Sequence, residues 1–145
     1  MLTFDHKALS QSLFGAFLAG LSRTITGVIP IWVGSAPSER QRIYFANHAS
    51  HGDFILLSSC LRPEDRARTR AVAGADYWRK GRLRRFLSGY LLRTVLVERN
   101  WVERSQDPMA VMLEALERGE SLIFFPEGTR HMTEEPILRF RSGLY

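Results

Sequence analysis

Two short apolar runs in this sequence each end abruptly in a dense cluster of polar residues. The first, RIYFA at 42–46, leads into NHASHGD, and the second, LIFF at 122–125, leads into PEGTR. Short apolar runs bounded by turn residues are typical of buried strands. Because helical patterns lie between these runs and further strand-like segments at 70–75 and 95–97, we expect an α/β fold. The sheet is predicted to be mixed, mostly parallel and flanked by helices.

The position of the two polar clusters favours a functional role for them. In open α/β sheets, ligands bind outside the carboxyl ends of the strands. NHASHGD and PEGTR both follow the carboxyl end of a predicted strand. The sequence therefore predicts that one site contains residues from both clusters.

Helices are predicted at 53–61, at 76–92 and from Asp107-Pro108 to Gly119. The last has an N-cap residue, a proline at the first helical position and a glycine at the end. Its inner face is predicted to hold Met109, Met112, Leu113 and Leu116, and the apolar stripe of 76–92 to hold Leu83, Phe86, Leu87, Tyr90 and Leu91. Residues 27–33 (GVIPIWV) are β-rich, but Pro30 indicates an edge strand or an irregular lead-in.

The N-terminal segment forms an amphipathic pattern. Apolar residues recur at helical spacing at Leu9, Leu13, Phe17, Gly20, Leu21 and Ile25. Asp5 argues against a signal peptide, and Arg23 interrupts the apolar stretch before the ~20 residues that a membrane span needs. Such a helix either packs on the domain or lies in a membrane interface, and its pattern alone leaves both open. We therefore divide the chain into this helix, 1–26, and a main domain, 27–145.

Positive charge is concentrated in the middle of the chain. Residues 62–104 carry twelve basic and five acidic side chains, which gives this segment a net charge of +7. The whole chain has a net charge of +5, so the other residues together carry −2. A basic segment suits an anionic partner such as nucleic acid, a phospholipid surface or a polyphosphate cofactor, and it also suits a solvated arginine-rich face. The single cysteine, Cys60, excludes an internal disulfide and fits a reducing compartment.

His48 and Asp53 form the first candidate pair for chemistry. At a strand-to-helix turn, the carboxylate can fold back onto one imidazole nitrogen and leave the other as a proton acceptor. Ser50 fits a turn hydroxyl better than a nucleophile. A metal site built from His48, His51 and Asp53 is disfavoured, because no third histidine lies nearby in the sequence.

Together, NHxSxxD and FPEGTR about 80 residues later resemble the lysophospholipid/glycerol-phosphate acyltransferase family. The resemblance covers about residues 42–145. VLVER at 95–99 is similar to another block of the family, with Glu98 for the usual Asp, Leu96 for Phe and Arg93 for an upstream Gly. FRSG at 140–143 resembles a further block of the family, in which Lys is usual at the position of Arg141. His131 stands where the family more often has Ser.

The resemblance implies transfer of a fatty acyl group from acyl-CoA or acyl carrier protein to a lysophospholipid hydroxyl, with 1-acylglycerol-3-phosphate the expected acceptor. It implies no cofactor beyond the thioester co-substrate, and no metal. His48 would be the general base and Asp53 its orienting partner. The resemblance assigns the acceptor site to Arg99, Glu127, Gly128, Thr129 and Arg130.

The chemistry of these residues agrees with that assignment. Arginines give phosphate bidentate, charge-assisted hydrogen bonds. Gly128 allows backbone N–H groups to approach an anion, and Thr129 can donate a hydroxyl. Glu127 is expected to hold Arg99 or Arg130 in place.

A lipid substrate favours the membrane-interface alternative for residues 5–25, at the cytoplasmic face of the cell membrane. The expected partner is an anionic membrane surface, with peripheral or monotopic attachment, and nucleic acid is not expected. The family continues beyond FRSGLY, so we expect the domain to be C-terminally incomplete. Two other functions stay open: an acyl-thioester hydrolase, and a catalytically silent membrane-associated module.

Overall fold

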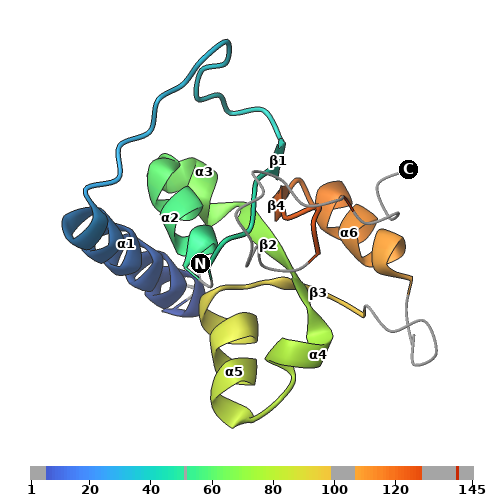
Figure 1. Ribbon diagram of the computed structural model, residues 1–145. Helices are drawn as coiled ribbons and strands as arrows, with labels where there is room; N and C mark the ends of the chain where they lie inside the picture. Colours follow the sequence, from blue (N-terminus) through green and yellow to red (C-terminus); the bar gives the residue numbers. More distant parts are fainter. Residues whose placement is uncertain (1–5, 51, 99–106, 129–139, 141–145) are drawn as a thin grey trace, which may run out of the picture.

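The computed structural model describes residues 6–50, 52–98, 107–128 and 140 (Figure 1). The helices are α1 (His6–Thr26), α2 (Asp53–Cys60), α3 (Pro63–Ala67), α4 (Ala75–Trp78), α5 (Arg82–Phe86) and α6 (Pro108–Glu117), and a π-helical turn, η1 (Leu87–Leu91), continues α5. The strands are β1 (Ile43–Phe45), β2 (Thr69–Gly74), β3 (Val95–Val97) and β4 (Ser121–Phe124).

The four strands form one sheet in the order β1-β4-β2-β3, and all pairings among the described residues are parallel. Phe45 of β1 lies opposite Phe124 of β4, and Val72 of β2 lies opposite Val95 of β3. This confirms the predicted α/β fold. Because the strands are parallel, their carboxyl ends meet at one edge of the sheet, where NHASHGD and PEGTR follow neighbouring strands.

Helices lie on both sides of the sheet. Figure 1 shows α6 on one side and α2 and α3 on the other, with α1 outside them. The core between α6 and the sheet contains Val72, Val95, Ala115 and Leu122. As predicted, Asp107 is the N-cap residue of α6, where its side chain accepts a hydrogen bond from the Met109 N–H, and the helix ends before Gly119, which has φ 76°.

The predicted inner face of α6 is half wrong. Met112 and Leu116 pack against the core, but Met109 and Leu113 are exposed, and Val111 and Ala115 lie inward instead. The face of α6 that contacts β3 and β4 is therefore shifted around the helix axis, by about one residue towards the N-terminus, from the face that the sequence predicts.

The predicted helix 76–92 is interrupted. It divides into α4, α5 and η1, with Gly81 between the first two at φ 85°. A right-handed helix cannot continue through a positive φ, and glycine adopts one at little cost. Leu83 and Phe86, assigned to the apolar stripe, are exposed.

The prediction for β1 needs correction, because β1 was expected to be buried but is an edge strand of three residues with Ile43 and Phe45 exposed. For residues 27–33 the sequence left open an edge strand or an irregular lead-in, and the structure has the second, a largely exposed irregular segment. The short helix α3 was missed, although Pro63 occupies its first turn, where proline is favoured.

The predicted N-terminal helix is present as α1, which contacts α2, α3 and η1. Ala19 is buried, whereas the predicted stripe is mostly exposed, including Phe17 (63%) and Ile25 (73%). The Arg23 guanidinium donates a hydrogen bond to the Ser59 carbonyl in α2. In the described part of the chain, no helix is both long and apolar enough to cross a membrane.

Candidate active site

The side chains of His48 and Asp53 meet in the turn between β1 and α2. His48 lies just after β1, and Asp53 is the first residue of α2. Nδ1 of His48 is 3.0 Å from Oδ2 of Asp53. The same Oδ2 accepts the backbone N–H groups of Ala49 (2.7 Å) and Ser50 (2.8 Å). The sequence-predicted pair is therefore held in contact, and the turn itself fixes the carboxylate.

Ser50 is part of this turn. Its hydroxyl donates to Oδ1 of Asp53 at 2.8 Å and accepts the N–H of Gly52 at 3.0 Å. Burial alone would raise the pKa of Asp53, but the hydrogen bonds from Ser50, His48 and Ala49 lower it below its usual value. Asp53 is therefore ionised at neutral pH and can stabilise a charge on His48.

The His48 ring also stacks on Phe125, with ring centroids 4.3 Å apart and planes inclined by 27°. Phe125 follows β4 and immediately precedes Pro126 and Glu127. A backbone hydrogen bond from the Ala46 N–H to the Phe124 carbonyl joins the same two segments. Sequence reasoning missed this role for Phe125, although its place at the end of the LIFF run, beside PEGTR, is a signal for it.

The PEG segment turns sharply after β4. The N–H of Gly128 donates to the Phe125 carbonyl at 3.0 Å, and Gly128 has φ 65°, which glycine adopts readily. Glu127 is only 2% exposed, and neither of its carboxylate oxygens has a hydrogen-bond partner among the described residues. A buried carboxylate needs a cation or donors, because desolvation of an unpaired charge is costly.

The other predicted acceptor-site residues, Arg99, Thr129 and Arg130, lie outside the described residues, as does His51. Glu98, directly before Arg99, forms an ion pair with Arg79, which links the end of α4 to the end of β3. Among the described residues, no group of three or more His, Cys, Asp or Glu side chains is placed to hold a metal ion.

A cavity of about 270 Å³ lies between α1, α2, α3 and the start of β2. Phe54, the residue after Asp53, lines it together with Gly15, Leu18 and Ile55, and Arg66, Arg70 and Arg93 supply positive charge. His48, Asp53 and Glu127 do not line it. The cavity is therefore next to the His48–Asp53 pair in the fold but separate from it.

Comparison with known proteins gives one match. A family model described as Acyltransferase matches residues 33–145, which is more than half of the chain. No curated protein and no solved structure matches.

Proposed function

We propose a specific acyl transfer for this chain from one premise, which is that the chain belongs to the acyltransferase family. The donor is a fatty acyl-CoA or an acyl carrier protein thioester. The acceptor is the hydroxyl of a lysophospholipid, with 1-acylglycerol-3-phosphate the first candidate, and the product is a phospholipid precursor. The observation that carries this proposal is the contact of His48 with both Asp53 and Phe125 at the carboxyl edge of the sheet.

In the proposed reaction His48 is the general base. When its Nδ1–H donates to Asp53, its Nε2 has a lone pair that can accept the proton of the acceptor hydroxyl. The hydroxyl oxygen then attacks the thioester carbonyl carbon. The carbon–sulfur bond breaks, and the thiolate takes the proton from the imidazolium. A thioester is already activated, so alignment and a base suffice without a covalent enzyme intermediate.

The acceptor's phosphate is assigned to Arg99 and Arg130, with Gly128 and Thr129 as further hydrogen-bond donors. Glu127 supports this assignment, because its buried carboxylate calls for a cationic partner. We assign Glu127 to orienting one of these guanidinium groups. This places the phosphate next to the turn after β4, which begins at Phe125, the residue on which His48 stacks.

We assign the acyl chain to the cavity between α1 and α2. Its lining is largely apolar, and Phe54 brings it to the residue that follows Asp53. An acyl chain there would have its thioester end towards the turn before α2.

The exposed apolar stripe of α1 supports attachment at a membrane surface, for which we propose the cytoplasmic face of the cell membrane. Leu9, Leu13, Phe17, Leu21 and Ile25 share this stripe, and an exposed row of this kind fits a lipid interface. Leu13→Ser/Phe17→Ser should reduce sedimentation with liposomes. Met109→Ser/Leu113→Ser, which alters two exposed residues of α6, is the matched control. Equal liposome binding by both variants would exclude this role for α1.

The reaction is tested by offering labelled acyl-CoA with several lysophospholipids and identifying the products. We expect acylated lysophosphatidate, and a rate lowered about 10²–10⁴-fold by His48→Ala. Release of free fatty acid without an acceptor would instead identify a thioester hydrolase. A rate unaffected by His48→Ala would contradict both enzymatic functions.

A further inference from the structure

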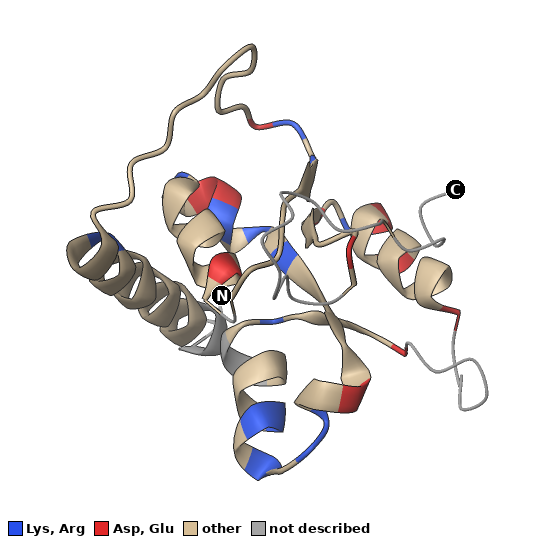
Figure 2. Ribbon diagram, viewed as in Figure 1, with Lys and Arg blue, Asp and Glu red and all other residues tan. Residues whose placement is uncertain are grey.

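The segment 77–94 has an unusual charge composition. It contains six basic residues and no acidic residue. The structure divides it into the end of α4, the turn at Gly81, α5 and η1, and Figure 2 shows the basic residues gathered on α5 and the preceding turn. The question is which of these cations the protein itself neutralises.

Only two of the six form ion pairs within the described residues. Arg79 pairs with Glu98, and Arg93 lies 3.5 Å from a carboxylate oxygen of Glu120. Lys80, Arg82, Arg84 and Arg85 are exposed and pair with no described carboxylate. The guanidinium of Arg84 lies over the Tyr77 ring, 4.4 Å from its centroid. We call Lys80, Arg82, Leu83, Arg84, Arg85 and Phe86 the basic patch.

The basic patch also exposes two large apolar side chains. Leu83 is 69% exposed and Phe86 is 51% exposed, both on α5. Apolar side chains beside solvated cations are typical of segments that lie in the interfacial region of a bilayer. A soluble polyphosphate would use the cations but would give no reason for exposed leucine and phenylalanine.

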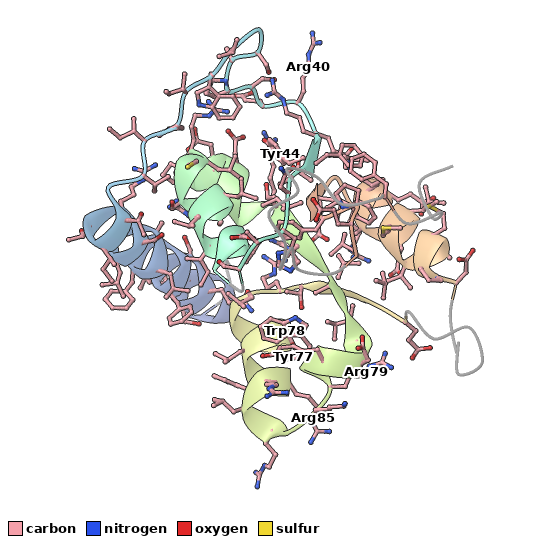
Figure 3. The ribbon with its side chains drawn as sticks, viewed as in Figure 1. Arg40, Tyr44, Tyr77, Trp78, Arg79 and Arg85 are labelled. Carbon is pink, nitrogen blue, oxygen red and sulfur yellow. The ribbon has the colours of Figure 1, made fainter. Side chains whose placement is uncertain are left out.

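The basic patch is connected to α1 through η1. α5 leads directly into η1, and η1 contacts α1. Figure 3 shows Arg85 at one end of the molecule and Arg40 at the other, so the cations of α5 are well separated from that arginine. An exposed apolar row on α1 and a cationic helix linked to it through η1 are each complementary to an anionic bilayer.

We propose that the basic patch binds the headgroups of anionic phospholipids, with Leu83 and Phe86 entering the boundary between headgroups and acyl chains. This surface adds an electrostatic contact to the α1 stripe and selects anionic over neutral bilayers. It acts in binding and not in the chemical step. It therefore stands independently of the proposed acyl transfer.

The test is sedimentation with vesicles of phosphatidylcholine alone and of phosphatidylcholine with phosphatidylglycerol. Each cation near an anionic surface contributes roughly fivefold in binding, so Arg82→Gln/Arg85→Gln should weaken binding to the anionic vesicles about 25-fold. Added salt should reduce binding of the unaltered chain and abolish this difference. Arg40→Gln/Arg118→Gln is the control, because it has the same net charge as Arg82→Gln/Arg85→Gln but leaves the basic patch intact. It should bind anionic vesicles as the unaltered chain does.

Leu83→Ser/Phe86→Ser separates the apolar contribution, since it should weaken binding to both kinds of vesicle. His48→Ala should bind vesicles normally even though it loses acyl transfer, so the two proposals can fail separately. Unchanged binding of Arg82→Gln/Arg85→Gln to anionic vesicles would overturn the proposal. The proposal would also be overturned if Arg82→Gln/Arg85→Gln kept vesicle binding but had a higher KM for acyl-CoA in detergent, or lost activity only with acyl donors on an acidic carrier protein. Either result would assign these cations to binding of the acyl donor.

Discussion

The imidazole of His48 stacks on the ring of Phe125, with centroids 4.3 Å apart, although the two residues are 77 positions apart in the sequence. Parallel pairing of β1 with β4 makes this contact, because Phe45 and Phe124 are in register and each strand then ends at the same edge. On its other side, His48 is held by Asp53 at 3.0 Å. The ring is thus fixed by one contact within its own polar cluster and by one from the residue that precedes the other cluster.

Loss of the aromatic support should slow the reaction without unfolding the protein. Phe125→Ala removes the surface on which His48 rests and lets the imidazole rotate, and a misplacement of about 1 Å can cost on the order of a hundredfold in rate. We expect kcat to fall by roughly tenfold or more while the far-ultraviolet circular dichroism is unchanged. Phe45→Ala alters an exposed ring on β1 and is the control. If both variants have equal kcat, His48 does not depend on Phe125.

Asp53→Asn tests the carboxylate. The amide oxygen can still accept the N–H groups of Ala49 and Ser50, so the turn should be retained. The negative charge beside His48 is lost, however, so the imidazolium that forms when His48 accepts a proton is stabilised less. We expect kcat to fall about 10²–10⁴-fold with little change in KM. Ser50→Ala removes only one hydrogen bond to Asp53 and should have a much smaller effect, since Asp53 keeps its backbone donors.

Most of the fold follows from patterns that depend on neighbouring residues. The strands at 43–45, 95–97 and 121–124 were predicted to within one residue at each end, and the cap residues Asp107 and Gly119 were predicted as well, because local chemistry determines them. The interruption of 76–92 was not, because an isolated glycine is tolerated in helical sequences and only its φ of 85° shows that the helix stops.

Burial was harder to predict than secondary structure. Ile43 and Phe45 are as apolar as Leu122 and Ile123, yet the first pair lies on an edge strand and the second in the centre. Strand order decides this, and strand order depends on contacts between distant segments. At the site, the pairing of His48 with Asp53 is local and was predicted, whereas its contact with Phe125 required the sheet.

Glu127→Gln tests the assigned role of the buried carboxylate. If Glu127 orients an arginine that holds the acceptor's phosphate, the neutral amide weakens that ion pair and raises KM for lysophosphatidate by roughly tenfold or more. An acceptor without a phosphomonoester should be affected less. Glu117→Gln, at an exposed position of α6, is the control. A fall in kcat alone, with KM unchanged, would indicate acid–base chemistry by Glu127 instead.

Gly15→Leu tests the cavity as the acyl-chain site. Gly15 lines the cavity, and a Cβ placed on it meets no atom within 4 Å, so a side chain can begin there without a backbone clash and occupy part of the space. Each buried methylene group contributes ~0.8 kcal/mol, so losing room for two of them should favour octanoyl over palmitoyl donors by roughly tenfold. Gly20→Leu lies on the same helix, does not line this cavity and is the control. An unchanged ratio of kcat/KM for the two donors would place the acyl chain elsewhere.

Asp65 should make stability depend on pH. It is 4% exposed and accepts hydrogen bonds from Nε of Arg62 and Nη2 of Arg68, each at 2.6 Å. Its backbone carbonyl also accepts the hydroxyl of Thr69, the first residue of β2. These contacts join α3 to the start of a central strand.

The hydrogen bond from Arg62 is the main cause that lowers the pKa of Asp65 below its usual value of 3.8, against the opposing effect of burial. A carboxylate with a lowered pKa contributes stability above its unfolded pKa and loses it as the pH falls through the folded value. Asp65→Asn should therefore lower the Tm by several degrees at pH 7 and have progressively less effect as the pH falls below 3.8, because the carboxylate is then protonated in the unfolded chain before it is protonated in the folded one. Glu64→Gln is a matched control, because Glu64 pairs with the same Arg62 at 3.3 Å but is exposed, and exposed ion pairs contribute little. Thermal unfolding of the three proteins between pH 3 and pH 7 measures the effect. A Tm difference for Asp65→Asn that is as large at pH 3 as at pH 7 would show that packing, rather than ionisation of Asp65, stabilises this part of the fold.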